Sequence, residues 1–216
     1  PSSRTNASTY HEIFAQGDAW LKVVESAETV RKGLSPTTKT FLKELGCILH
    51  GDPFSTVPIP DIFWTASAAY WAYLYARLAL LQIDVVSMSQ LVGGPNTPSV
   101  GIGPNYPSVT MLDWKTGKPT ARWFVLKMLV RAFGNRLKRM VPTNLESKAF
   151  STLARERLDP EANLFAQGWE VEEKDGRKVR KILLVNKALE ASSTVDISGG
   201  PWGCMEAIDG RDPWAS

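Results

Sequence analysis

Hydrophobic positions recur at helical spacing in three stretches of the chain, and each stretch predicts a helix. The first covers residues 10–30, although the pair Gly17-Asp18 could interrupt it. Residues 62–82 are apolar and aromatic almost throughout, which predicts one long, buried helix. A third helix is predicted over residues 119–134, because proline suits a first helical turn and glycine a C-terminal stop.

Shorter stretches with other patterns predict strands and loops in the first part of the chain. Residues 83–88 are apolar and partly β-branched, which is typical of a buried strand. Residues 36–49 are open to two interpretations, because their leucines fit helical spacing while their threonines and Gly46 favour a strand. Residues 1–9 are polar, and we expect a loop there.

The last third of the chain has the pattern of antiparallel strands. Residues 164–173 and 179–186 are extended runs joined by Lys-Asp-Gly-Arg, and Asp-Gly between two such runs predicts a hairpin. Residues 193–197 predict another strand. The change of pattern divides the chain into an expected α/β part, residues 1–135, and an expected antiparallel β part, residues 136–216.

Composition and charge are those of an ordinary globular protein. Hydrophobic residues make up 44% and charged residues 22% of the chain, which argues against disorder. The net charge of +3 is small, so nucleic-acid binding would need a local basic surface. Residues 115–139 hold eight basic and no acidic residues, but no base-reading motif accompanies them. A solvated helix face explains them equally well, and we expect no nucleic-acid partner.

The apolar stretch at residues 62–82 is long enough to cross a bilayer, which leaves a membrane anchor as an alternative. Its tryptophans and tyrosines gather in the middle, however, rather than at the ends where interfacial anchors belong. Arg77 would lie inside the apolar zone, at a cost of about 2.5–3.5 kcal/mol. We therefore expect a helix packed against a sheet, and no membrane partner.

Residues that usually bind metals are few and scattered. His11 and His50 are isolated, and no Cys-x-x-Cys pair occurs in the sequence. We expect neither a metal nor another cofactor. Pairing between Cys47 and Cys204 stays open, because it depends on their distance in space.

Four segments carry a resemblance to a known family. They are LSPTTKTFLKELG at 34–46, IDVVSMSQ at 83–90, VTMLDWKTGKPTARWFVLKML at 109–129 and KILLVNK at 181–187. In this order the chain resembles the C-terminal portion of retaining clan A glycoside hydrolases, the group that contains β-xylosidase-like and iduronidase-like enzymes. The resemblance implies an α/β fold with the last two β/α units of a TIM (β/α)₈ barrel over residues 1–135. It also implies part of an antiparallel β-sandwich over residues 136–216.

The resemblance implies that Glu44 is the catalytic nucleophile, since the family carries this glutamate at the C-terminal end of the seventh barrel strand. The assignment requires residues 38–44 to form a strand, because barrel enzymes place their chemistry at the C-terminal ends of strands. A carboxylate there attacks the anomeric carbon of a sugar and is later displaced by water. The alternative is a solvated glutamate on a short helix.

Four further residues are expected to bind the substrate because of their positions. Gln90 follows the strand expected over residues 83–89, where its amide would hydrogen-bond a sugar hydroxyl. His50 would line the rim, and Trp64 and Trp114 would stack on a sugar face. Plainer roles are open to all four, as loop residues for the first two and as core residues for the tryptophans.

Two features depart from the family pattern. A complete barrel needs about 250 residues, and the Asn-Glu pair that carries the family's acid/base is absent from the sequence. Retaining hydrolysis needs two carboxyls about 5–5.5 Å apart. We therefore expect the chain to be inactive alone and to lack the N-terminal half of its barrel. A non-catalytic carbohydrate-binding or scaffold protein is the alternative.

The implied substrate is an oligo- or polysaccharide whose O-glycosidic bonds are cleaved by double displacement. The family, together with a possible glycosylation sequon at Asn6, implies a secreted or extracellular protein. The chain begins with Pro1, and no signal-peptide pattern precedes Tyr10, so we expect a processed or partial chain.

Overall fold

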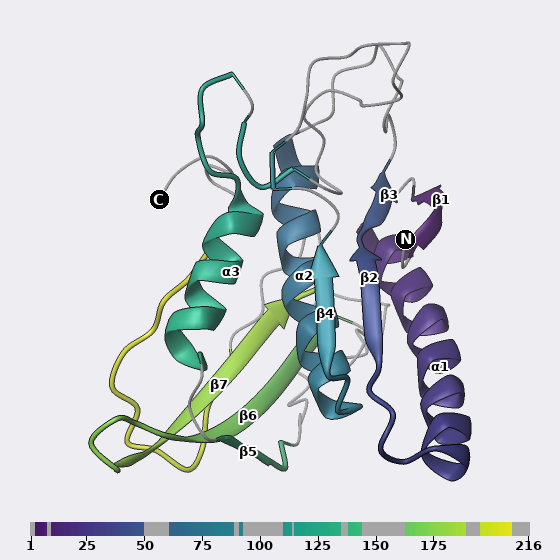
Figure 1. Cartoon of the computed structure of the whole chain (residues 1–216). Coiled ribbons are helices and arrows are strands. Elements are labelled where there is room, and N and C mark those ends of the chain that lie inside the picture. The colour runs from purple at the N-terminus through teal and green to yellow at the C-terminus, as the bar shows by residue number, and fades with distance from the viewer. Residues whose placement is uncertain are drawn as a thin grey trace, which may run out of the picture. The chain divides into compact units, whose positions relative to one another are not determined.

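The chain forms two compact units, and Figure 1 labels their helices and strands. Unit 1 comprises residues 1–127 and 208–216, and unit 2 comprises residues 128–207. The computed structural model describes residues 3–7, 10–49, 61–88, 91–92, 110–113, 115–134, 138–143, 163–188 and 195–208.

Unit 1 alternates strands with helices. Its elements are β1 (Ser3–Ala7), α1 (Tyr10–Leu34), β2 (Phe41–Leu45), β3 (Cys47–Leu49), α2 (Asp61–Leu80), β4 (Val85–Met88) and the beginning of α3 (Ala121–Ala132). β1 pairs with β3 and β2 pairs with β4, and both pairs are parallel. Parallel neighbours need a crossover connection, which includes α1 for the first pair and α2 for the second.

Two expectations about the strands of unit 1 are settled by this pairing. The ambiguous stretch 36–49 contains strands and no helix, with Gly46 separating β2 from β3. The loop expected over residues 1–9 was wrong, because β1 lies there and pairs with β3. A polar strand held by a neighbour that is distant along the chain leaves no mark on the hydrophobic pattern.

α1 continues without a break through Gly17-Asp18, the pair that the sequence left as a possible interruption. Gly17 is buried against α2, and a Cβ atom there would lie 2.7 Å from Cε2 and 2.9 Å from Oη of Tyr70. Phe14, one turn earlier, meets the ring of Tyr70 edge-on at 5.7 Å between centroids. The glycine therefore allows two helices to approach closely and does not break the first one.

A polar contact joins the same two helices. The hydroxyl of Tyr73 donates to Oδ1 of Asp18 and accepts a hydrogen bond from Nη1 of Arg77 at 2.9 Å. Burial, together with the bond to Asp18, raises the pKa of Tyr73 well above its ordinary value. Arg77, the single charge of the apolar stretch, is thus part of a contact between helices.

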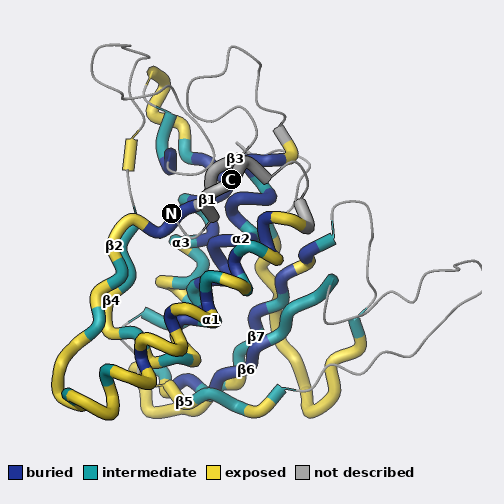
Figure 2. The backbone as a smooth tube through the Cα atoms, turned by 90° about the vertical axis from the view of Figure 1, so that its right-hand side faces the viewer, coloured by how far each residue is buried: buried dark blue, intermediate teal, exposed yellow. Residues whose placement is uncertain are grey.

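α2 is buried on nearly every side, as the dark blue tube in Figure 2 shows. Helices that are apolar all round belong in the interior of a fold, and α2 is the centre of unit 1. Among the described residues, no helix combines the length and apolarity that crossing a membrane requires. The buried side chains of α2 are Phe63, Trp64, Ala66, Ser67, Ala68, Tyr70, Trp71, Ala72, Tyr73, Leu74, Ala76 and Leu78.

Unit 2 is built on one antiparallel sheet with the strand order β5 (Lys138–Val141), β6 (Leu164–Glu172) and β7 (Lys178–Asn186). The predicted hairpin is confirmed, and Gly176 takes a positive φ of 81° at its turn. One face of the sheet is buried, and there Phe133 packs on Trp169 with 4.7 Å between ring centroids. The strand expected over residues 193–197 does not form in its described part, residues 195–197.

The expected fold class was wrong. Neither a barrel nor a sandwich is present in the described segments, which hold two pairs of parallel strands and one three-stranded sheet. A barrel requires a continuous, closed sheet, and a sandwich requires two facing sheets. In unit 2 an extended segment, residues 195–202, lies on the second face of the sheet in place of another sheet.

Candidate functional site

Glu44 lies near the C-terminal end of β2, inside an irregularity of the strand. Residues of β2 and β4 are paired from Phe41 opposite Val85 to Leu45 opposite Met88, and the register shifts between Leu42 and Leu45. Within that shift Glu44 has a φ of 61°, in the left-handed region that residues other than glycine seldom occupy. Glu44 thus belongs to a strand and not to a short helix.

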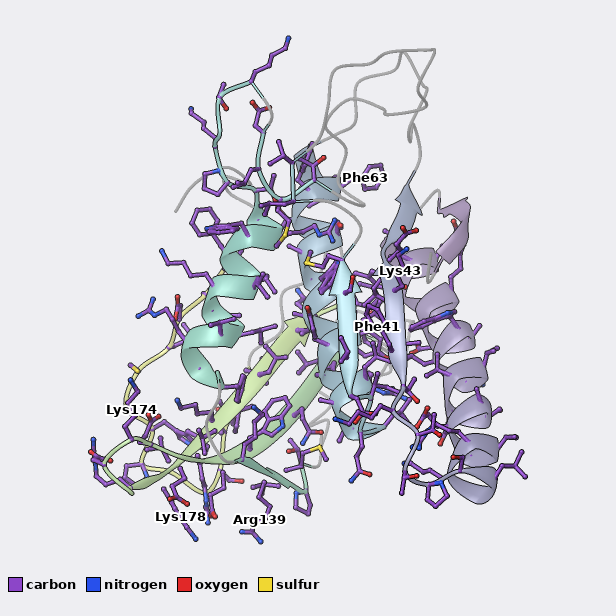
Figure 3. All side chains as sticks on the ribbon, in the orientation of Figure 1. Phe41, Lys43, Phe63, Arg139, Lys174 and Lys178 are labelled. Atoms are coloured by element: carbon purple, nitrogen blue, oxygen red, sulfur yellow. The ribbon has the colours of Figure 1, made fainter. Side chains whose placement is uncertain are left out.

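Glu44 is an exposed residue of β2. The Glu44 carboxylate makes no hydrogen bond or ion pair within the segments that the structure describes. Its neighbours along β2, Phe41 and Lys43, are also exposed, and Figure 3 shows their side chains on the strand. The first part of the β2–β4 pair therefore presents uncovered side chains, with Phe41 60% and its partner Val85 49% exposed.

A cluster of polar groups fixes the chain that leads into β2. Glu28, on α1, is almost fully buried and receives hydrogen bonds from Arg31, with Nη2 at 2.9 Å and Nε at 3.0 Å from Oε2. Arg31 also donates to the main-chain oxygens of Ser35, Pro36 and Thr38. One guanidinium therefore holds the connection between α1 and β2.

Thr40 extends this cluster to β4. Its hydroxyl donates to Oε1 of Glu28, and its main-chain N–H donates to Oδ2 of Asp84 at 2.8 Å, just before β4 begins. The bonds from Arg31 and then Thr40 hold the pKa of Glu28 below its ordinary value. We call Glu28, Arg31, Thr40 and Asp84 the entry clamp, because together they place the beginnings of β2 and β4 side by side.

Of the four expected substrate-binding residues, the structure describes one, Trp64. Trp64 is on α2, with 6% of its surface exposed, which favours a role in the core of unit 1 over stacking on a sugar. Gln90, His50 and Trp114 lie outside the described residues. Their roles at a sugar site stay predictions.

The basic stretch does not form one continuous surface. Arg122 is 1% exposed, and its guanidinium carbon lies 5.0 Å from the ring centroid of Trp71. A buried cation over an indole face is a packing contact of the core. Arg131, by contrast, is exposed and pairs with Glu206 at 3.2 Å.

Unit 2 contains a cavity of about 270 Å³ that the sequence does not indicate. It lies between the second face of the sheet and the segment of residues 195–202. Trp202 and Asp196 come from that segment, and Arg180 comes from β7. The run Gly199-Gly200-Pro201 in this segment is typical of a turn and does not by itself indicate a cavity.

Gly168 of β6 also lines this cavity, and its N–H donates to the hydroxyl of Thr143 at 2.8 Å. No group of three His, Cys, Asp or Glu side chains among the described residues is placed to hold a metal ion. Cys204, two residues beyond Trp202, is an exposed free thiol.

In comparisons with known proteins, no family model, no curated protein and no solved structure matches the chain.

Proposed function

We propose that the chain contributes the nucleophile of a retaining glycoside hydrolase, and that Glu44 is this nucleophile. In such a reaction a carboxylate oxygen forms a bond to the anomeric carbon of the sugar while the bond to the leaving group breaks. The leaving group departs with the electron pair, and water later displaces the carboxylate. The proposal depends on the carboxylate and its strand, and does not require a closed barrel.

The backbone of Glu44 is the observation that supports this role best. A left-handed conformation costs an L-residue about 1–2 kcal/mol, and glycine or asparagine would relieve that cost. Glu44 is exposed, and no hydrogen bond or ion pair of its side chain in the described segments offsets this cost. Strain that folding does not need is typical of residues retained for function.

The entry clamp supports the same role. A nucleophile must be held close to its productive position, and rigid secondary structure does this better than a loop. Glu28, Arg31 and Thr40 hold the start of β2, and the N–H bond to Asp84 ties it to β4. The position of the Glu44 backbone is therefore set by buried contacts at the other end of a five-residue strand.

The acid/base is proposed to come from other residues of the protein or from a partner, because the sequence has no Asn-Glu pair. Phe41 and Val85 face each other across the β2–β4 pair and are exposed, and both faces of a parallel sheet are normally covered. Another part of the protein, or a partner, that covers them would also bring the second carboxyl to the sugar.

Labelling with activated fluoro-sugars tests the nucleophile without requiring the acid/base. Dinitrophenyl glycosides in which fluorine replaces the hydroxyl next to the anomeric carbon need no protonation, because dinitrophenolate leaves unaided. With the glucose, xylose, galactose and mannose forms, we expect one of them to add a single glycosyl ester, found by peptide mapping on Glu44. Label on another carboxylate, or on none, would refute the assignment.

Two variants control this experiment. E44Q keeps the size and hydrogen-bonding reach of the side chain but has no nucleophilic oxygen, so we expect no label with an unchanged circular dichroism spectrum. E170Q removes another carboxylate, from unit 2, and should be labelled like the parent chain. Equal labelling of E44Q and the parent would show that the ester forms elsewhere.

A further inference from the structure

We propose that the cavity of unit 2 is a second carbohydrate-binding site, at which Trp202 is the stacking platform for one ring of a neutral sugar chain. The site involves no residue of unit 1, so binding there is independent of the role of Glu44. The volume of about 270 Å³ is slightly below the range of about 300–1,000 Å³ that is typical of small-molecule pockets. A cavity of this size suits one ring of a longer ligand.

Trp202 is held in place as a platform should be. Its indole N–H donates to the main-chain oxygen of Ile197 at 3.2 Å, which leaves the faces of the ring for packing. A Cβ atom on Gly200 would lie 2.6 Å from Cδ1 and 2.8 Å from Nε1 of Trp202, so the indole rests directly on the glycine. Trp202 as a residue remains 39% exposed, and it lines the cavity.

The turn beneath the indole is fixed to the sheet. Gly199 has a φ of 87°, a conformation that glycine adopts freely, and its main-chain oxygen accepts a hydrogen bond from Nη1 of Arg180 at 3.3 Å. Four residues beyond this segment, Glu206 pairs with Arg131 of α3. The platform is therefore preorganised, which reduces the entropy lost when a ligand binds.

The polar groups around the platform favour a neutral sugar. An aromatic face attracts the C–H face of a pyranose, and hydroxyls at the ring edge need donors and acceptors beside it. Asp196 and Ser198 supply acceptors, and Arg180 supplies N–H donors. Because Arg180 and Asp196 carry opposite charges, together they add no net charge to the site. The ammonium group of Lys181, another lining residue, is bound to Glu173 at 2.7 Å.

Fluorine NMR of the full chain labelled with 5-fluorotryptophan tests the site residue by residue, since the sequence has eight tryptophans. W202F identifies the Trp202 resonance by its absence. The probes are linear hexasaccharides of β-linked glucose, of β-linked xylose and of galacturonate. We expect a neutral hexasaccharide to shift the Trp202 resonance saturably, with a millimolar or tighter Kd.

Four variants decide the outcome. W202A and G200A should weaken the Kd at least about tenfold, because one removes the platform and the other displaces it. W202F should retain most of the affinity, and E44Q should bind like the parent chain, which separates this site from the proposed nucleophile. Calorimetry gives the Kd of the variants whose Trp202 signal is lost.

The proposal is overturned if no hexasaccharide shifts the Trp202 resonance, or if W202A binds like the parent. A preference for galacturonate over both neutral probes would overturn the neutral ligand class. Binding that is lost in E44Q and kept in W202A would place the sugar in unit 1 and not in this cavity.

Discussion

Replacing Arg31 by alanine (R31A) tests the entry clamp directly. The substitution removes the charge-assisted bonds to Glu28, at 2.9 and 3.0 Å, and leaves that carboxylate buried with only 6% of its side chain exposed. Truncating one partner of a buried ion pair costs about 3–5 kcal/mol. Because 18% of the Arg31 side chain is exposed and its bonds to Ser35 and Pro36 are long, we expect a loss of about 2–4 kcal/mol.

Urea unfolding monitored by circular dichroism measures this loss, and R131A is the matched control. The pair of Arg131 with Glu206 is 3.2 Å long, but its side chains are 65% and 51% exposed, and such pairs contribute about 0–1 kcal/mol. We therefore expect R131A to change the free energy of unfolding much less than R31A. Similar losses in both variants, or a loss below about 1 kcal/mol in R31A, would refute the role given to burial.

The pH dependence gives a second test of the same cluster. Because the pKa of Glu28 is lowered on folding, its contribution is fully present above the unfolded-state pKa of about 4.3. It is lost as the pH falls below that value and through the folded-state pKa. We expect the stability difference between the parent and R31A to be constant near neutral pH and to shrink below about pH 4. A difference that grows in acid would contradict the assigned direction of the shift.

Three further predictions use glycine and left-handed backbone positions. E44N should raise the free energy of unfolding by about 0.5–1 kcal/mol, while E44Q should leave it unchanged, because asparagine tolerates the φ of 61°; urea unfolding compares them, and equal stabilities would argue against strain. G17A should destabilise the chain by about 1–3 kcal/mol despite the better helix propensity of alanine, since Tyr70 fills the space. In a Y70L background the same change should become neutral or stabilising, and its failure to do so would place the clash elsewhere. G176A should lower the thermal midpoint by an amount equivalent to about 1 kcal/mol, whereas K174A, in the same turn, should not.

Local patterns were enough to predict most elements of this fold. The helix at 62–82 and the hairpin around Asp175-Gly176 are confirmed because each depends on residues close together in sequence. β1 was missed because its pairing with β3 is non-local and its own residues are polar. The barrel and the sandwich were expected from a resemblance in the order of segments, and order along a chain does not determine how sheets close.

For the candidate sites, too, some features could be predicted from the sequence and others could not. Glu44 was expected from the family resemblance, which implies a glutamate at the end of a strand, but its left-handed backbone could not be foreseen. The entry clamp joins Glu28 to Thr40 and Asp84, and the cavity joins Arg180 to Trp202. Contacts of this kind depend on packing between elements, which hydrophobic periodicity does not encode.

The absence of a polar stripe on α2 has a consequence for how the protein is made. A helix without a polar side is poorly solvated, so α2 is most prone to self-association in the interval before other elements of the fold cover it. Translation order shortens that interval, because α1 leaves the ribosome before α2. Phe14 and Gly17 of α1 are then already available to pack against α2. A circular permutant that delivers α2 ahead of α1 should therefore yield less soluble product, even though its finished fold would be the same.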